Sequence, residues 1–427
     1  MTGSLAAPGS AASAAGPASA RRLWPARRLF PLLATVGLVA IGMASTVWWG
    51  PGLFGKSTWT LPHDLWGTLV AARRLWHLDV SGLYTRPTGL VGFPGAAVIL
   101  VPVAAVIDAA GFSLRIPGAL NAHPGAWLLA GPYEIVLSAV ALFAADAIAD
   151  HLRVSRPKRA LLAAAGAVAL WNVSVRWGHP EDAVAVGLLL YGVLALSRAR
   201  EWRSAWLIGA AAAVQPLVLL ALPVILMTIP PRRLAGFLAR AAAPGALLLG
   251  IAAAANWTAT VSAVTRQPNW PSVDHPTPWM FLAPHLSHGA VASGPARVLA
   301  ILVACGCALA AGRRWRPARA GAPWSPRALQ ELLWWVAVTL ALRSAFEPVM
   351  VAYYLWPVLA VALIVAAASW SGLIATSVAA AALTFGSQLP WRGEWSWWAP
   401  MIAGLGITLY LARVRRPAGE TAYQPDS

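Results

Sequence analysis

Histidine and aspartate stand side by side in the segment TLPHDLWGTLVAARRLWHLDVSGLYTRP, residues 60–87, of a chain that is otherwise rich in Ala, Leu and Val. A carboxylate such as Asp64 can take the proton from an attacking hydroxyl group, and His63 can orient that carboxylate or tune its charge. We therefore predict that Asp64 is a general base, with His63 beside it. The alternative is structural: Asp64 caps a short amphipathic helix that begins here, and His63 is a surface residue.

A second group of acids opens a later apolar segment, where GHPED places His179, Glu181 and Asp182 around Pro180. Negative side chains stabilise the N-terminus of a helix, so a structural role explains Glu181 and Asp182 as well as a functional one does. The functional interpretation is that they bind the hydroxyl groups of an acceptor or supply a second catalytic carboxylate, with His179 beside them.

Two loops carry cations that can hold a phosphate group. Arg86 closely follows Tyr84 after the Asp64 segment, and Arg266 lies in a later polar segment. A guanidinium group pairs with two phosphate oxygens at once, which favours contact with a phosphorylated substrate. Contact with the headgroup of an anionic lipid is the alternative for Arg86.

The polar segment RQPNWPSVDHPTPWMFLAPHLSH, residues 266–288, contains Asp274 and His275. The spacing of its histidines in a loop broken by prolines does not match the helical histidine motifs of metalloenzymes, so we predict no metal site. A loop that covers the substrate is the favoured interpretation.

Three further polar residues lie in or beside apolar segments: Glu134, Glu347 and Tyr353. An acid within a membrane is energetically expensive unless it is paired, so Glu134 is expected to be functional or part of a polar network. Glu347 and Tyr353 are predicted to line the side of the site that receives the acceptor.

The composition identifies the environment that must position these residues. Hydrophobic residues make up 59% of the 427 residues and charged residues 11%, which is typical of membrane proteins with several spans rather than of soluble domains. The net charge of +17 comes from basic residues that cluster in short loops, a pattern that indicates membrane topology rather than nucleic-acid binding. Cys305 and Cys307 lie within one apolar run, so no disulfide framework is indicated.

Apolar segments of suitable length recur along the chain. They lie near residues 30–49, 91–110, 126–148, 158–173, 182–197, 203–228, 233–256, 294–312, 328–345, 348–369, 371–388 and 396–413. The arginines of RRLWPARRLF before the first segment favour a retained first helix over a cleaved signal peptide, with its N-terminus in the cytoplasm.

The positive-inside rule places the basic loops, among them HLRVSRPKR and SRAREWR, in the cytoplasm. This conflicts with one crossing for each segment. The conflict disappears if 91–110, which contains Pro102, lies in the external membrane face without crossing, and if 203–228 breaks at Gln215-Pro216 into two legs. We therefore predict an all-α bundle of about twelve transmembrane helices with both ends inside. The alternative keeps both segments as single spans and places basic loops outside.

This topology puts most of the candidate residues on the external side and divides the chain into five parts. We predict a disordered cytoplasmic N-terminus (1–29), a catalytic transmembrane module (30–256) with an external loop at 50–125, and an external substrate-covering loop (257–293). C-terminal transmembrane helices (294–413) and a cytoplasmic tail (414–427) follow. A site built from loops over rigid helices is expected at the external surface.

The order of several motifs resembles a known family. Asp64 after the first span, then GLY at 82–84, GFPGAAVILVP at 92–102, WGHPED at 177–182 and FEPVMVAYYLWPVLAVAL at 346–363 together look like the GT-C membrane glycosyltransferases. The likeness is closest to the actinobacterial polyprenol-phosphate-mannose-dependent mannosyltransferases and covers about residues 30–230. Three features depart from that pattern: Trp66-Gly67 where a Tyr is usual, GHPED in place of G-Q-x-D, and Gln215 where Lys is common.

The resemblance implies transfer of a sugar from a polyprenyl-phosphate donor to a glycolipid or lipoglycan acceptor on the outer face of the cell membrane. Mannose is the expected sugar, with arabinose as the competitor, and no further cofactor is implied. In this interpretation Gln215 belongs to the substrate-binding residues, and its replacement of Lys leaves open how the carrier phosphate is held.

Two other classes of protein are alternatives. A transporter or lipid flippase would also have many spans, but it should show internal repeats and charges near the middle of the membrane. A non-catalytic membrane protein of envelope assembly would have no need of Asp64.

Overall fold

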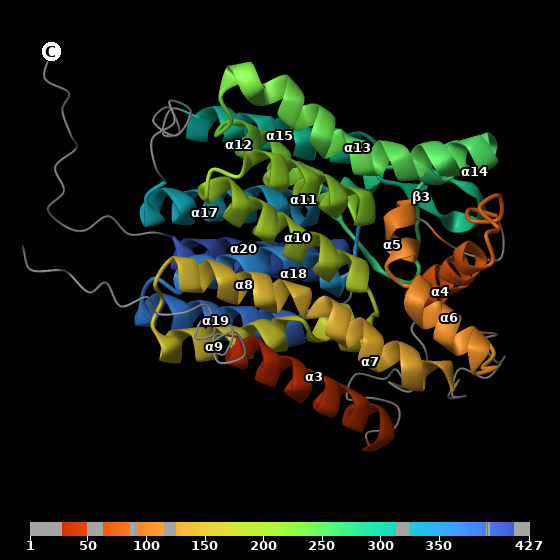
Figure 1. Ribbon diagram of the computed structural model, residues 1–427, viewed down its shortest axis with the longest axis horizontal. Helices are drawn as coiled ribbons and strands as arrows, with labels where there is room; N and C mark the ends of the chain where they lie inside the picture. The colour runs from red at the N-terminus through yellow and green to blue at the C-terminus, as the bar shows by residue number, and fades with distance from the viewer. Residues whose placement is uncertain are drawn as a thin grey trace, which may run out of the picture.

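The computed structural model describes residues 28–48, 63–85, 90, 92–114, 125–312, 324–389, 391 and 393–413. The described chain is mostly helical, in agreement with the predicted class (Figure 1). Its first half contains α3 (Leu29–Trp48), α4 (His63–Trp76), α5 (Pro94–Val98), α6 (Val101–Ala109), α7 (Ala126–Ser138), α8 (Val140–His151), α9 (Arg156–Ala169), η1 (Trp171–Arg176), α10 (Pro180–Ser197) and α11 (Glu201–Val214). The helices that follow are η2 (Pro216–Ala221), α12 (Leu222–Leu226), α13 (Pro231–Ala255), α14 (Trp257–Thr265), η3 (Pro278–Leu282), η4 (Ser287–Gly289), α15 (Gly294–Gly312), α17 (Pro326–Phe346), η6 (Ala352–Leu355), α18 (Trp356–Ala366), α19 (Trp370–Gly386) and α20 (Glu394–Ala412).

Within the described residues, four helical stretches are long and apolar enough to cross a membrane: Ala126–His151, which joins α7 and α8, and the helices α10, α13 and α15. A helix needs about 20 apolar residues to cross the hydrocarbon core. The protein is therefore a membrane protein. Shorter apolar helices lie among them at Leu29–Ser45, Pro216–Leu226, Ala352–Ala366 and Trp370–Gly386. The number of about twelve membrane crossings stays a prediction.

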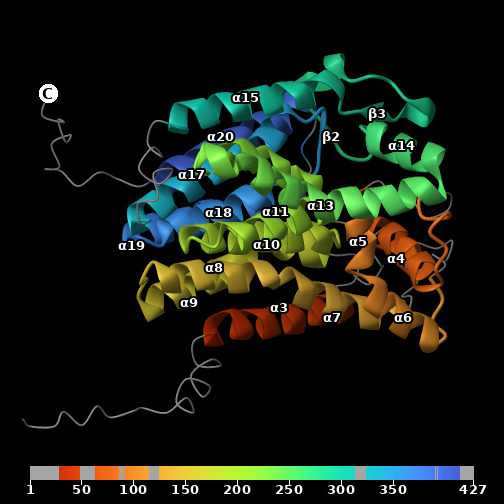
Figure 2. The ribbon, with the colours of Figure 1, turned by 45° about the horizontal axis from the view of Figure 1, so that its top comes forward.

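The long helices lie side by side along the longest dimension of the molecule (Figures 1 and 2). α10 occupies the interior of the bundle. Of its most apolar stretch 89% is buried, compared with 11% for α13 and 28% for α15. A helix that is apolar all round must be enclosed by others, whereas α13 and α15 leave apolar side chains for lipid. The short helices α4, α5, α6 and α14 gather at one end of the bundle, which we call the α4 end (Figure 1).

The segment near 91–110 forms two short helices, α5 and α6, instead of one span. The first ends at Val98 and the second begins at Val101 with Pro102 in its first turn. Both pack against α4 in a second apolar core around Leu69, Ala97 and Trp127. The predicted interruption is confirmed, and the absence of a crossing by this segment stays a prediction.

The predicted break at Gln215-Pro216 is confirmed. Helix α11 ends at Val214, Gln215 has an extended backbone with φ −146° and ψ 111°, and a 3-10 helix begins at Pro216. Proline lacks the N–H that would continue the helix, and its ring clashes with the preceding turn. The break turns the side chain of Gln215 away from the regular surface of both legs, where it can reach a neighbouring helix.

The segment 257–293, predicted as a loop, contains regular structure. Its first residues form α14, because Asn256 caps that helix by accepting a hydrogen bond from the N–H of Ala259 at 3.1 Å. Two small antiparallel sheets follow, which pair β1 (Pro268–Asn269) with β3 (Val291–Ala292) and β2 (His275–Pro276) with β4 (Val349–Met350). The second sheet fastens the segment to the chain between α17 and α18.

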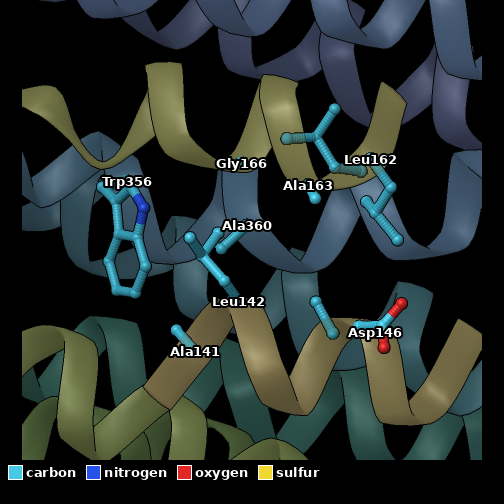
Figure 3. Close-up of a pocket in the computed structure, with 10 residues that line it drawn as sticks. Ala141, Leu142, Asp146, Leu162, Ala163, Gly166, Trp356 and Ala360 are labelled. Carbon is cyan, nitrogen blue, oxygen red and sulfur yellow. The ribbon is translucent and has the colours of Figure 1, made fainter. Parts of the chain in front are cut away.

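A buried ionic network lies at the opposite end of the bundle. Asp146, 2% exposed, accepts hydrogen bonds from Arg159 at 2.7 and 2.8 Å and from Arg28 at 2.6 Å. Arg159 also pairs with Asp150 at 2.7 Å. Figure 3 shows Asp146 beside a small cavity of about 20 Å³ that Leu142, Leu162 and other apolar side chains of α8, α9 and α18 line. The network joins α8 and α9 to the residue that precedes α3.

Candidate functional site

Asp64 lies in the first turn of α4. Its neighbours Leu65 and Leu69, 1% and 0% exposed, fix the helix in the second apolar core, while the side chain of Asp64 itself is 49% exposed. A carboxylate in the first turn favours the helix, but Asp64 is the second residue of α4 and not the capping residue that the structural alternative expected. The same position holds an accessible carboxylate on a rigid support. His63 begins α4, and its side chain is not among those described.

His179 joins Asp64 to Glu181. Its Nε2 lies 3.0 Å from Oδ2 of Asp64, and its Nδ1 lies 2.6 Å from Oε1 of Glu181. Asp64 and His179 are 115 residues apart in the sequence. Gly178, with φ of 67°, adopts the left-handed conformation that brings the chain from η1 into α10, and Pro180 then starts the helix. The imidazole is therefore clamped between two carboxylates.

Tyr353 of η6, the turn that precedes α18, adds an aromatic ring to the clamp that Asp64 and Glu181 form around His179. It stacks on the imidazole of His179 with the centroids 3.9 Å apart and the planes at 23°. Tyr354 packs edge-on against Tyr353 at 4.8 Å. His179 and Tyr353 are both buried. The predicted site residues Asp64, His179, Glu181 and Tyr353 thus come together at the α4 end.

The two carboxylates determine the charge of His179. Burial alone lowers the pKa of the imidazole, but the charge of Glu181 and the hydrogen bonds to Asp64 and Glu181 act in the opposite direction and prevail. The pKa of His179 is held well above its ordinary value of 6.5. The ring is therefore an imidazolium at neutral pH, and both of its N–H groups donate to carboxylates.

This charge predicts a pH-dependent contribution to stability. Because the pKa of His179 is higher in the folded protein than in the unfolded chain, the contribution is complete below about pH 6.5 and is lost as the pH rises through the raised folded pKa. Thermal unfolding in detergent between about pH 6 and pH 10 measures it. The parent should lose its advantage over His179→Gln as the pH rises, whereas exposed His285→Gln should track the parent. A constant difference across that range would contradict the charge assignment.

Asp182 and Gln215 form a second pair next to this clamp. Nε2 of Gln215 donates to Oδ1 of Asp182 at 2.6 Å, and Asp182 is fully buried. The other oxygen of Asp182 has no hydrogen-bond partner among the described residues. The extended backbone at the helix break is what allows Gln215 to reach α10.

Gln215 also borders a cavity of about 260 Å³ between η2, α15 and α17. Its polar lining residues are Gln215, Gln267, Arg297, Arg343 and Glu347. Glu347, 3% exposed, accepts hydrogen bonds from Ser293 and from Nη2 of Arg297, the latter at 2.8 Å. Glu347 therefore lies in the cavity wall rather than against His179.

Other predicted residues lie elsewhere. The hydroxyl of Tyr84 donates to the carbonyl of Gly92 at 3.0 Å, and burial raises its pKa. His275, next to Asp274, stacks on Trp397 with centroids 4.5 Å apart. Arg266 is exposed at the end of α14, and Arg86 lies outside the described residues.

Three arginines and one acid, Asp146, are important in the structure although the sequence patterns did not single them out. Arg343 and Arg297 line the cavity, and Arg159 binds Asp146. Arg343 lies within the apolar helix α17, which is the same signal that singled out Glu134, whereas Arg159 and Arg297 lie in the first turns of α9 and α15. Glu134 is fully buried, and both of its carboxylate oxygens lack hydrogen-bond partners within the described chain. Among the residues described, no three His, Cys, Asp or Glu side chains converge as metal ligands would.

The geometry defines a half-exposed carboxylate held by a buried imidazolium, beside a cavity that carries two arginines. Such a group can accept a proton at the end of the bundle, and the arginines can attract an anion. Comparison of the sequence with protein-family models and with curated proteins finds no match.

Proposed function

We propose that the protein is a membrane glycosyltransferase that moves a sugar, mannose in the first instance, from a polyprenyl-phosphate donor to a hydroxyl group of a glycolipid or lipoglycan. The observation that carries the proposal is the clamp on Asp64. A buried imidazolium holds one oxygen of an accessible carboxylate at 3.0 Å, and a second carboxylate holds the imidazolium at 2.6 Å. This arrangement orients a base without enclosing it.

The reaction assigns one role to each group. The hydroxyl oxygen of the acceptor attacks the anomeric carbon, the bond from that carbon to the phosphate oxygen breaks, and the carrier leaves as its phosphate. The acceptor's proton passes to the carboxylate of Asp64. His179 positions that carboxylate and does not itself touch the reacting atoms. Proton transfer of this kind typically contributes about 10²- to 10⁴-fold to a rate.

The membrane supports a lipid-linked donor. Apolar helices border the site, and an enzyme that works on the external face has no supply of cytosolic nucleotide sugars. The basic residue Arg153 lies in the connection between α8 and α9, and Arg156 and Lys158 lie in the first turn of α9, at the end opposite α4 (Figure 1). The positive-inside rule places such a connection in the cytoplasm, which supports an external location of the α4 end at the cell membrane.

The test is a transfer assay with the full chain reconstituted in vesicles. Radiolabelled polyprenyl-phosphate mannose, or the corresponding arabinose donor, is supplied together with a glycolipid extract from the source membranes. We expect labelled glycolipid to form when the α4 end faces the medium that contains the acceptor. Movement of labelled donor across the bilayer without a new glycosidic product would support a flippase instead. Absence of both with folded protein and both donors would contradict the proposal.

A further inference from the structure

The cavity between η2, α15 and α17 combines a charged interior with an apolar mouth. Leu219 of η2 and Ile301 of α15 line it and are 43% and 48% exposed. Both belong to apolar helices, and most of α15 is not covered by other helices. The mouth of the cavity therefore lies on an apolar outer surface of the bundle, of the kind that faces the hydrocarbon of a bilayer.

The charges inside the cavity leave an excess of one positive charge. Its lining contains two arginines, Arg297 and Arg343, and one acid, Glu347. Arg297 pairs with Glu347 at 2.8 Å, and Ser293 supplies Glu347 with a further hydrogen bond. The negative charge of Glu347 is thus met by Arg297, which leaves Arg343 as the cation available to a ligand.

Arg343 is held in place but incompletely bonded. Its guanidinium lies over the ring of Tyr354 at 3.6 Å, and Tyr354 packs on the Tyr353 that stacks on His179. The Nη1 nitrogen of Arg343 is buried and has no hydrogen-bond partner among the described residues. Two acids attract it: Glu347 is paired with Arg297, whereas Asp182 accepts a hydrogen bond from Gln215 through one oxygen and has no partner for its other oxygen among the described residues. A partly buried cation with unused hydrogen-bonding capacity favours an anionic ligand.

We propose that this cavity binds the phosphate headgroup of a lipid at Arg343, with the hydrocarbon chain leaving past Leu219 and Ile301 into the bilayer. The amide of Gln215, fixed by Asp182, borders the same space and contacts the group attached to the phosphate. The identification of the lipid as a sugar donor rests on the proposed function, whereas binding of a lipid phosphate does not require it.

Equilibrium binding to the full chain in phosphatidylcholine nanodiscs tests the site, with radiolabelled farnesyl phosphate as the probe. Farnesol, which lacks the charge, and inorganic phosphate, which lacks the chain, are the comparison ligands. Arg343→Gln should weaken the binding of farnesyl phosphate by roughly ten- to a hundredfold and leave that of farnesol unchanged. Arg343→Lys should fall between the two because it keeps the charge but not the fork of donors.

The mouth provides a test that does not depend on a buried charge. Ile301→Trp narrows the opening and should weaken the binding of both farnesyl phosphate and farnesol. Leu302 is a neighbour on α15 that is 61% exposed and does not line the cavity, so Leu302→Trp should weaken the binding of neither. If Arg343→Gln fails to fold, this pair still decides the matter. Equal binding by Ile301→Trp and the parent would overturn the proposal, as would a folded Arg343→Gln that binds farnesyl phosphate normally.

Two further outcomes separate this inference from the proposed function. If inorganic phosphate displaces the radiolabelled probe as well as unlabelled farnesyl phosphate does, the cavity is a site for soluble anions and the lipid assignment is overturned. Binding as expected together with no sugar transfer would leave the lipid site standing and remove the glycosyltransferase. If the parent protein transfers sugar and the Arg343→Gln variant binds farnesyl phosphate like the parent, the lipid site at Arg343 is wrong and the proposed glycosyltransferase stands.

Discussion

Replacement of Asp64 by Asn is expected to lower the rate of sugar transfer by roughly 10²- to 10⁴-fold. Asparagine preserves the shape of the side chain and its hydrogen bond with His179, but it cannot accept the acceptor's proton. Initial rates with saturating donor measure the effect. Binding of farnesyl phosphate should remain as in the parent, because Asp64 does not line the cavity.

A matched acid distinguishes loss of the base from loss of one negative charge. Glu394 is the exposed first residue of α20 and lies in the first turn of its helix, as Asp64 does in α4. Glu394→Gln should transfer sugar at the parent's rate. Full activity of the Asp64→Asn variant in folded protein would remove Asp64 from the mechanism and return it to the role of a residue that stabilises the start of α4.

Much of the helical framework can be predicted from the sequence, because a helix that crosses the bilayer needs a continuous run of about 20 apolar residues. Apolar runs near 294–312 and 182–197 reappear as α15 and α10 with ends within two residues. Pro216 and Pro102 correctly indicated a break and an interruption, since proline acts on the backbone locally. The segment 257–293 was predicted as a loop, yet its first part contains no proline and forms α14 behind the cap that Asn256 supplies.

The site is less accessible to sequence because it depends on which helices become neighbours. The candidates Asp64 and His179 were each recognised by type, but only the packing of α4 against the start of α10 brings them to 3.0 Å. Tyr353 and Glu347 are close in sequence, yet the first stacks on His179 and the second turns to Arg297. The strand β4 lies between them, and the two side chains contact different neighbours on either side of it. The spacing of residues in the sequence does not predict this difference.

Removal of the carboxylate of Asp146 is expected to have the largest effect on stability. Asp146 is 2% exposed and accepts both forked hydrogen bonds of Arg159, itself 7% exposed, and one from Arg28. Asp146→Ala leaves these cations buried with only Asp150 beside them. Breaking a buried pair on one side typically costs about 3–5 kcal/mol. Reversible unfolding in mixed detergent micelles measures the loss.

Two companion variants establish that the loss comes from the uncompensated cation rather than from the missing side chain. Asp150 is 36% exposed at its side chain, so Asp150→Asn should cost no more than about 1 kcal/mol. The double variant Asp146→Leu with Arg159→Met removes both partners and should recover much of the stability, because packed apolar side chains can replace a buried ion pair at little cost. An Asp146→Ala protein as stable as Asp150→Asn would mean that water reaches Arg159 and that the network does not hold α8, α9 and the start of α3 together.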